Sequence, residues 1–148
     1  MGKLVNYITQ LHKSTKRLYI ERMQDNKVEC MIEAKKYDFN YWDGDRRYGY
    51  GGYKFIDGRW KPVAEILIKN YNLTNDSKIL DVGCGKGFLL YEIKKILPEI
   101  KVYGFDSSEY AIKNSKDEIK SNLLIHDASK QFPFKDQEFD LVFSLNTL

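Results

Sequence analysis

The sequence predicts a protein of the α/β class, built on a parallel sheet. From residue 77 onward, short apolar runs alternate with helical segments, which is the pattern of parallel strands joined by right-handed crossovers. A length of 148 residues suits one domain with a buried core. The composition, 43% hydrophobic and 30% charged, is typical of a globular chain and argues against a disordered one.

Residues 1–60 are expected to form an N-terminal cap ahead of a domain at residues 61–148. Apolar side chains recur at helical spacing over residues 4–37, which predicts helix there. Residues 37–60 gather nine of the 21 aromatic residues and five of the ten glycines. This composition is unsuited to a helix and lacks the strict alternation of a half-buried strand, so we expect a loop rich in aromatic side chains.

The remaining elements follow in chain order. A helix is predicted at residues 59–71, because Pro62 suits a first turn and the apolar residues Val63, Ile66, Leu67 and Tyr71 share one face. The predicted strands are residues 78–82, 101–106, 122–126 and 139–144, and the predicted helices between them are residues 86–97 and 108–119.

Charge and cysteine content narrow the class of function. The formal net charge is +3, and the basic residues near the N-terminus are interleaved with acidic ones. This favours a solvated helix face over a nucleic-acid-binding arm. Cys30 and Cys84 lie far apart, which predicts neither a disulfide framework nor a metal cluster. No apolar run is long enough to span a membrane and no secretory signal is recognisable, so we expect a cytoplasmic protein.

The sharpest motif is a glycine-rich stretch at residues 81–87, DVGCGKG, between a predicted strand and a predicted helix. Glycines there let the chain turn tightly and let a ligand approach backbone N–H groups at a helix N-terminus. Asp106 ends the next predicted strand, 19 residues after Gly87, where a carboxylate can accept hydrogen bonds from ribose hydroxyls.

The glycine spacing discriminates between ligands. The third glycine comes one residue early for a dinucleotide fingerprint, which sets back a nicotinamide-dependent dehydrogenase. No Gly-Lys-Ser/Thr follows the loop, which disfavours a nucleoside triphosphate. A cofactor with a ribose and a positively charged end fits better.

Three further motifs follow the glycine loop, at residues 102–107 (VYGFDS), 126–128 (HDA) and 132–142 (FPFKDQEFDLV). In this order and spacing, the four motifs resemble the cofactor-binding half of class I S-adenosylmethionine-dependent methyltransferases, of the type that acts on small molecules. The resemblance covers about half of the chain. It implies a Rossmann-like sheet with strands 3-2-1-4 of the seven-stranded methyltransferase fold, and methyl transfer to an O, N or C nucleophile of a small molecule.

The resemblance also implies a cofactor-binding role for ten residues. The glycine loop would pass the aminoacyl group and the ribose of S-adenosylmethionine, with Asp81 near the cofactor's amino group. Asp106 would bind the ribose hydroxyls, and Asp127 would accept a hydrogen bond from the adenine amine. The full set is Asp81, Gly83, Cys84, Gly85, Gly87, Asp106, Ser107, Asp127, Ala128 and Ser144.

Structural alternatives stay open for several of these residues. Asp127 can instead cap a turn, and Ser107 or Ser108 can serve only as a helix N-cap. His126 is interpreted as a half-buried structural histidine rather than a catalytic base. We assign no catalytic residue and no metal ligand from the sequence.

Substrate-side candidates come from the aromatic stretch, because Tyr and Arg supply oriented polar groups on rigid or extended apolar bodies. The alternative is that these side chains only pack against the sheet. The candidates are Arg46, Tyr48, Tyr50, Tyr53 and Arg59.

The end of the chain bears on both substrate and partners. Residues 144–147 read SLNT, not the Asn/Asp-Pro-Pro-aromatic loop of methyltransferases that act on bases or glutamine amides. The chain stops just after the fourth predicted strand, which leaves residues 139–144 at a sheet edge. We expect a truncated product, one half of a split enzyme, or an oligomer that covers this edge. The alternative function is a non-catalytic fragment that binds the cofactor or a partner chain.

Overall fold

The computed structural model describes residues 7, 20 and 26–145. Most of the helix predicted over residues 4–37 therefore lies outside the described residues. Helix α3 (Lys27–Ala34) confirms its last part. No helix in the described part of the chain is long and apolar enough to cross a membrane.

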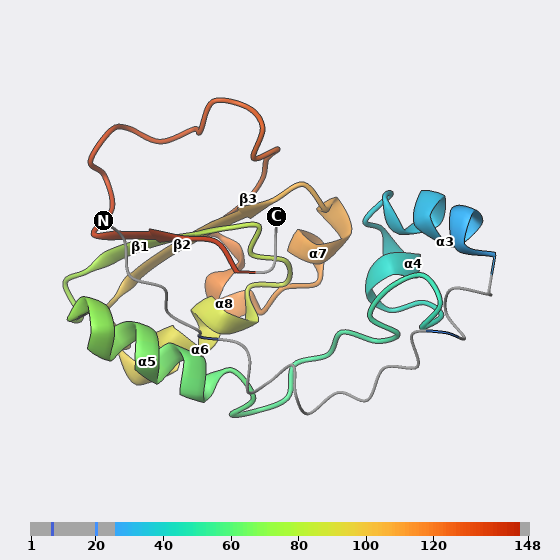
Figure 1. Ribbon diagram of the computed structural model, residues 1–148. Coiled ribbons are helices and arrows are strands. Elements are labelled where there is room, and N and C mark those ends of the chain that lie inside the picture. The colour runs from blue at the N-terminus through green and yellow to red at the C-terminus, as the bar shows by residue number, and fades with distance from the viewer. Residues whose placement is uncertain (1–6, 8–19, 21–25, 146–148) are drawn as a thin grey trace.

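Four parallel strands form one sheet (Figure 1). The strands are β1 (Lys78–Val82), β2 (Lys101–Asp106), β3 (Leu123–Ile125) and β4 (Leu141–Phe143). Their order is β3-β2-β1-β4, which confirms the predicted fold class and strand order. β1 and β2 have the predicted bounds, whereas β3 and β4 are shorter than predicted at both ends.

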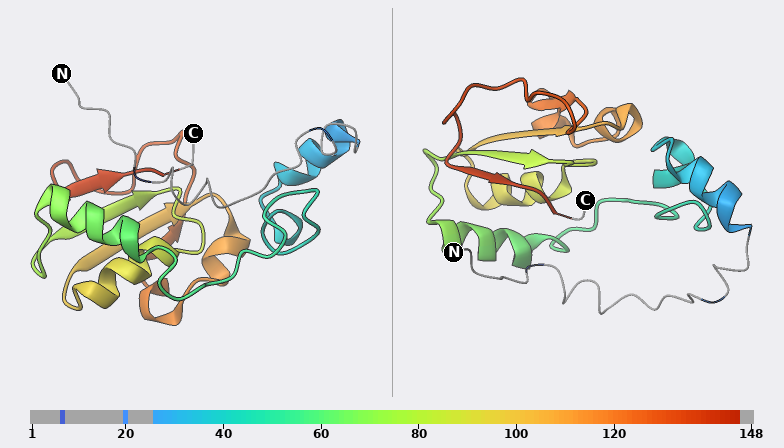
Figure 2. Two further views of the ribbon diagram at one scale, coloured as in Figure 1. Left: turned by 60° about the horizontal axis from the view of Figure 1, so that its bottom comes forward. Right: turned by 45° about the horizontal axis from the view of Figure 1, so that its top comes forward.

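Helices α5 (Lys61–Tyr71) and α6 (Phe88–Ile96) pack together on one face of the sheet (Figure 2). Because side chains of a strand alternate between its two faces, Ile79 of β1 joins the core under these helices and the next residue, Leu80, faces the other side. That other side is covered by the loop between β3 and β4, whose Phe134 lies edge-on to Tyr103.

The predicted helix at residues 108–119 is two short helices, α7 (Glu109–Lys113) and α8 (Asp117–Lys120). Side chains between them compete for backbone carbonyls: Asn114 donates to the carbonyl oxygen of Tyr110 at 2.8 Å, and Ser115 donates to that of Ile112 at 2.7 Å. Such local hydrogen bonds interrupt a helix.

Two smaller expectations need correction. The predicted loop at residues 37–60, called the aromatic segment below, contains a one-turn helix, α4 (Phe39–Trp42), begun by Asp38, whose carboxylate accepts from the amide of Asn40. Helix α5 buries Val63 and Leu67 as predicted, but Ile66 is 38% exposed. The sheet covers a narrower stripe of α5 than the sequence pattern indicated.

Strand β4 lies at the edge of the sheet, as the sequence predicted. Among the described residues it pairs only with β1, from Ile79↔Leu141 to Asp81↔Phe143. Val142 is 51% exposed there. The order of the strands places the carboxyl ends of β1 and β2 side by side at the middle of one sheet edge, where the glycine loop begins.

Candidate functional site

The glycine loop joins the carboxyl end of β1 to helix α6. The amides of Gly83 and Cys84 both donate to the carbonyl oxygen of Phe105, at 2.8 and 3.0 Å, which ties the loop to β2. Gly85 and Gly87 have φ angles of 56° and 69°, in the left-handed region that favours glycine. Gly87 also caps α6. The loop therefore presents backbone N–H groups and a helix N-terminus at the edge of the sheet.

Asp106, the last residue of β2, joins this loop to the following helix. One carboxylate oxygen, Oδ2, accepts from the amide of Gly85 at 2.8 Å, and Oδ1 accepts from the amide of Ser108 at 2.8 Å. Burial raises the pKa of Asp106 although these two hydrogen bonds favour its charged form. The carboxylate thus stands beside the glycine loop, where the sequence predicted it.

Asp81 places a second carboxylate below the loop. It is 5% exposed, and no described residue donates a hydrogen bond to it or pairs with it as a cation. Burial, and then the nearby charge of Asp106, raise the pKa of Asp81 to about 8. Burying a carboxylate without a partner is costly. Two neighbouring carboxyl groups without a cation fit a ligand that brings positive charge.

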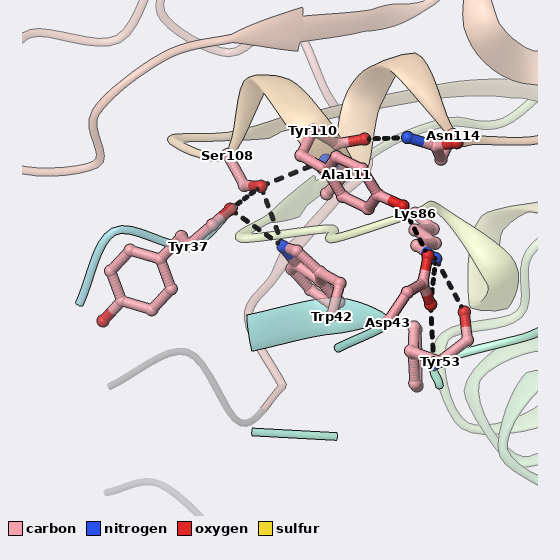
Figure 3. Close-up of polar contacts among 9 residues, drawn as sticks. All are labelled: Tyr37, Trp42, Asp43, Tyr53, Lys86, Ser108, Tyr110, Ala111 and Asn114. Carbon is pink, nitrogen blue, oxygen red and sulfur yellow. Dashed lines mark hydrogen bonds and ion pairs between the residues drawn. The ribbon is translucent and has the colours of Figure 1, made fainter. Parts of the chain in front are cut away.

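The aromatic segment lies directly over the loop (Figure 3). Trp42 is 6% exposed, and its indole Nε1 donates to Ser108 Oγ at 2.8 Å and to the carbonyl oxygen of Tyr37 at 3.1 Å. A Cβ atom placed on Gly85 would lie 2.8 Å from Trp42 Cη2. Only glycine fits under this ring. Tyr50 stacks on the Trp42 ring, with a centroid distance of 5.3 Å and an interplanar angle of 11°.

Lys86, within the loop, is paired with the same segment (Figure 3). Its Nζ donates to the carboxylate of Asp43 at 2.9 and 2.7 Å and to the carbonyl oxygen of Tyr53 at 2.9 Å. Tyr110 of α7 donates its hydroxyl proton to Asp43 at 2.8 Å. The segment is therefore fixed to both the loop and α7 by a partly buried polar network.

Two tyrosines of the segment, Tyr41 and Tyr53, are close enough to the two carboxyl groups for the carboxyl charges to affect their pKa values. Burial first, and then neighbouring tyrosines, raise the pKa of Tyr41 and of Tyr53 well above the ordinary value. The charge of Asp106 adds to this effect at Tyr41, and that of Asp81 adds to it at Tyr53. Both phenols are therefore neutral at physiological pH and keep their O–H protons.

The other predicted cofactor residues lie farther along the same edge of the sheet. Ser107 is exposed, and its neighbour Ser108 is the N-cap of α7, where it accepts from the amide of Ala111 at 3.0 Å. Asp127, after β3, accepts from the amide of Ser129 at 2.8 Å, which lowers the pKa of Asp127. The structural alternatives, an N-cap for Ser108 and a turn cap for Asp127, are thus both present.

Three further residues at this edge are either exposed or packed against an aromatic ring. Ala128 and Ser144 are exposed, after β3 and β4 respectively. The ring of His126 lies edge-on to Phe105 at 5.2 Å, and its Nε2 is buried without a partner among the described residues. This packing agrees with the interpretation of His126 as structural. The ligand roles of Ser107, Asp127, Ala128 and Ser144 stay predictions, as do those of Asp81, Asp106 and the residues of the glycine loop.

The substrate-side candidates divide into two groups. Tyr50 and Tyr53 contact each other, with ring centroids 4.6 Å apart. Tyr50 also stacks on Trp42, and Tyr53 stacks on Phe88 at the start of α6. Arg46 donates to the carbonyl oxygens of Gly49 and Tyr50, at 2.7 and 2.9 Å, and thereby holds the turn. Tyr48 is half-buried and lies under the guanidinium of Arg47, and Arg59 is exposed.

Sequence reasoning missed the residues that join the segment to the loop. Trp42, Asp43 and Lys86 were all visible inside motifs, but no spacing indicated that Asp43 and Lys86 form a pair across 43 residues. The only feature of the sequence that pointed to this ion pair was the presence of a basic residue, Lys86, inside the glycine loop. Its contact with an acidic residue of the segment depends on how the two units pack.

Comparison with known proteins places this geometry in a family. The family described as "Methyltransferase domain" matches residues 73–148, just over half of the chain and all four strands. The structure of coclaurine N-methyltransferase bound to N-methylheliamine and SAH aligns with 93% of this chain and 45% of that one, with a TM-score of 0.50 and 14% identity. That similarity concerns the fold alone.

Two curated relatives align over most of the chain. The tRNA U34 carboxymethyltransferase of Nautilia profundicola is 31% identical over 102 residues, which cover 64% of this chain and 33% of that protein. The demethylmenaquinone methyltransferase of Thermotoga maritima is 27% identical over 110 residues, which cover 74% of this chain and 43% of that protein. The chain thus spans between a third and a half of the length of these relatives.

Proposed function

The chain belongs to the methyltransferase-domain family, of the class that depends on S-adenosylmethionine, and on that premise we propose that it transfers a methyl group from this cofactor to a small-molecule acceptor. The observation that carries the proposal is a pair of neighbouring carboxyl groups beside the glycine loop, the buried Asp81 and the half-buried Asp106. S-adenosylmethionine brings an ammonium group and a sulfonium group, and thus the positive charge that this site lacks.

The residues present fit this cofactor. Asp106 already orders the loop through the amide of Gly85 and offers lone pairs to ribose hydroxyls. Asp81 would face the positively charged end, and backbone N–H groups at the start of α6 suit a carboxylate. When bound, the cofactor supplies an electrophilic methyl group. The chain's own residues bind it, orient it and shield it from water.

The acceptor side is proposed to be formed by the aromatic segment. Tyr50 and Tyr53 offer apolar ring faces together with hydroxyl groups, and the Tyr53 ring stacks on Phe88 at 5.1 Å. Such a wall suits a flat or apolar small molecule better than a charged polymer. One relative is named for demethylmenaquinone and the other for a tRNA, so the relatives support both acceptor classes. The SLNT sequence after β4 favours the small molecule.

A second candidate function rests on the sheet edge. β4 pairs on one side only among the described residues, and the chain spans less than half the length of its two relatives. We propose as the alternative a fragment of a split or truncated methyltransferase that binds the cofactor or a complementary chain without turnover. In either case we propose a cytoplasmic protein, and a second copy or a partner chain that covers residues 139–144.

The decisive experiment is calorimetric titration of S-adenosylhomocysteine (SAH) into the 148-residue chain, followed by an assay of SAH formation from S-adenosylmethionine with quinone-like phenols and with unmodified tRNA. Binding together with turnover on a phenol supports the enzyme, and turnover on tRNA alone refutes the small-molecule acceptor. Binding without turnover supports the second candidate. A folded chain that binds no SAH refutes the cofactor site.

A further inference from the structure

Lys86 lies inside the glycine loop, yet its ammonium group faces the aromatic segment rather than the solvent. The residue is 4% exposed. It donates to both carboxylate oxygens of Asp43, at 2.9 and 2.7 Å, and to the carbonyl oxygen of Tyr53 at 2.9 Å. An ammonium group has three N–H donors. These acceptors use its full capacity, so Lys86 has no donor left for a ligand.

Asp43 is held by more than this lysine. It accepts from the hydroxyl of Tyr110 at 2.8 Å and from the amide of Tyr53 at 3.0 Å. Burial alone raises the pKa of Asp43, but the hydrogen bonds from Lys86 and Tyr110 outweigh it and hold this pKa below its ordinary value. Asp43 is therefore a carboxylate at neutral pH. A charged, partly buried pair with satisfied geometry loses much when one partner is removed.

This pair sits between the two parts of the segment that contact the loop. On one side, Trp42 covers Gly85. On the other, Tyr53 stacks on Phe88, the first residue of α6. Because Asp43 directly follows Trp42 and also accepts from the Tyr53 amide, the ion pair fixes both contacts at once. The segment therefore covers the glycine loop at Gly85 and the start of α6 at Phe88.

We propose that the Lys86–Asp43 ion pair is a positioning latch: it docks the aromatic segment on the glycine loop and so sets how fast the cofactor binds and leaves. The inference rests on the proposed function for its ligand, but the docking itself concerns only this chain. Lys86 is a positioning residue because it acts through the segment and has no donor free for substrate or cofactor.

The docking is tested by hydrogen–deuterium exchange of the full chain without ligand. Lys86→Met keeps the apolar part of the side chain and removes the charge. The matched control is Lys78→Met, because Lys78 pairs with Glu138 at the opposite end of β1. The amides of Gly52 and Tyr53 both donate to the carbonyl oxygen of Trp42, and that of Tyr53 also donates to Asp43. Their exchange is expected to accelerate about tenfold or more in Lys86→Met and to stay unchanged in Lys78→Met.

The effect on the cofactor is tested by stopped-flow binding of SAH. Lys86→Met is expected to raise the association and dissociation rate constants by about tenfold, because the segment opens more often. Lys86→Arg keeps the charge, so its dissociation rate constant for SAH is expected to stay close to that of the wild type. Asp43→Asn breaks the same pair without changing the loop, and it replaces Lys86→Met if that variant does not fold.

The outcomes separate the latch from the proposed function. Unchanged exchange of the segment in Lys86→Met or Asp43→Asn overturns the latch. Faster exchange with unchanged SAH rate constants also overturns it, because the segment then does not control the site. A wild-type chain that binds no SAH overturns the proposed cofactor and its control by the segment, while the exchange rates still decide the docking.

Discussion

The carboxylate of Asp106 accepts a hydrogen bond from the backbone amide of Gly85, 2.8 Å away. This contact joins the end of β2 to the middle of the glycine loop. The same carboxylate accepts from Ser108, so one side chain orders both the loop and the start of α7. Its loss is expected to affect any ligand bound there, through direct contact and through the shape of the loop.

Asp106→Ala is expected to weaken SAH binding by about tenfold or more, because hydrogen bonds to a charged group contribute roughly 1.5–3 kcal/mol. Calorimetry measures the dissociation constant. Asp140→Ala is the matched control: Asp140 also accepts from a backbone amide, that of Lys78 at 2.7 Å, but at the opposite end of β1. An equal loss of SAH affinity in both variants would show that the substitution acts through the general stability of the chain and not through the site.

The raised pKa of Asp81 predicts that the free energy of unfolding depends on pH. Its pKa in the folded chain is about 8, against an ordinary value of 3.8, so the folded state holds a proton that the unfolded state has released between these values. Protonation of Asp81 therefore favours the folded state. This contribution to the free energy of unfolding is fully present below about pH 4 and is lost as the pH rises toward 8. The slope is at most about 1.4 kcal/mol per pH unit.

Urea unfolding of the wild type and of Asp81→Asn between about pH 5 and pH 8 checks this dependence. The free energy of unfolding of the wild type is expected to fall relative to that of Asp81→Asn as the pH rises. Parallel curves for the two proteins would show that Asp81 is ionised throughout and that burial does not hold its proton.

Gly85→Ala is expected to lower the free energy of unfolding and to displace Trp42. A left-handed φ costs a non-glycine residue roughly 1–2 kcal/mol, and the added Cβ would lie 2.8 Å from the indole ring. Gly58→Ala is the control, because Gly58 has a φ of 73° but open space around its Cβ position. Both variants bear the backbone cost. Only Gly85→Ala is expected to shift the tryptophan emission, and an equal shift in both would contradict the contact.

Leu67→Ala is expected to lower the free energy of unfolding by about 2–5 kcal/mol, because the side chain is 1% exposed in the core under α5. Its neighbour Ile66 is 38% exposed, so Ile66→Ala is expected to cost less than about 1 kcal/mol. Chemical denaturation compares the two. Similar losses in the free energy of unfolding would show that Ile66 is also buried, as the sequence pattern indicated for this helix.

The sheet could be predicted because its signals are local. β1 and β2 were predicted with the bounds that the structure shows, since each is an apolar run that ends at an Asp or a Gly-rich turn. The break between α7 and α8 was missed because Asn114 and Ser115 occur in helices as well as between them. Their hydrogen bonds to the preceding turn decide the break, and a pattern of apolar residues does not register them.

The candidate site divides in the same way. The sequence determined the parallel sheet, the glycine loop and the position of Asp106 at the end of β2, because parallel strands bring their carboxyl ends to one edge. Only the tertiary structure decided that Trp42 covers Gly85 and that Lys86 pairs with Asp43. Contacts between residues 43 positions apart depend on which surfaces pack together and exclude water. No local sequence pattern in either segment indicates which residues of the other it will contact.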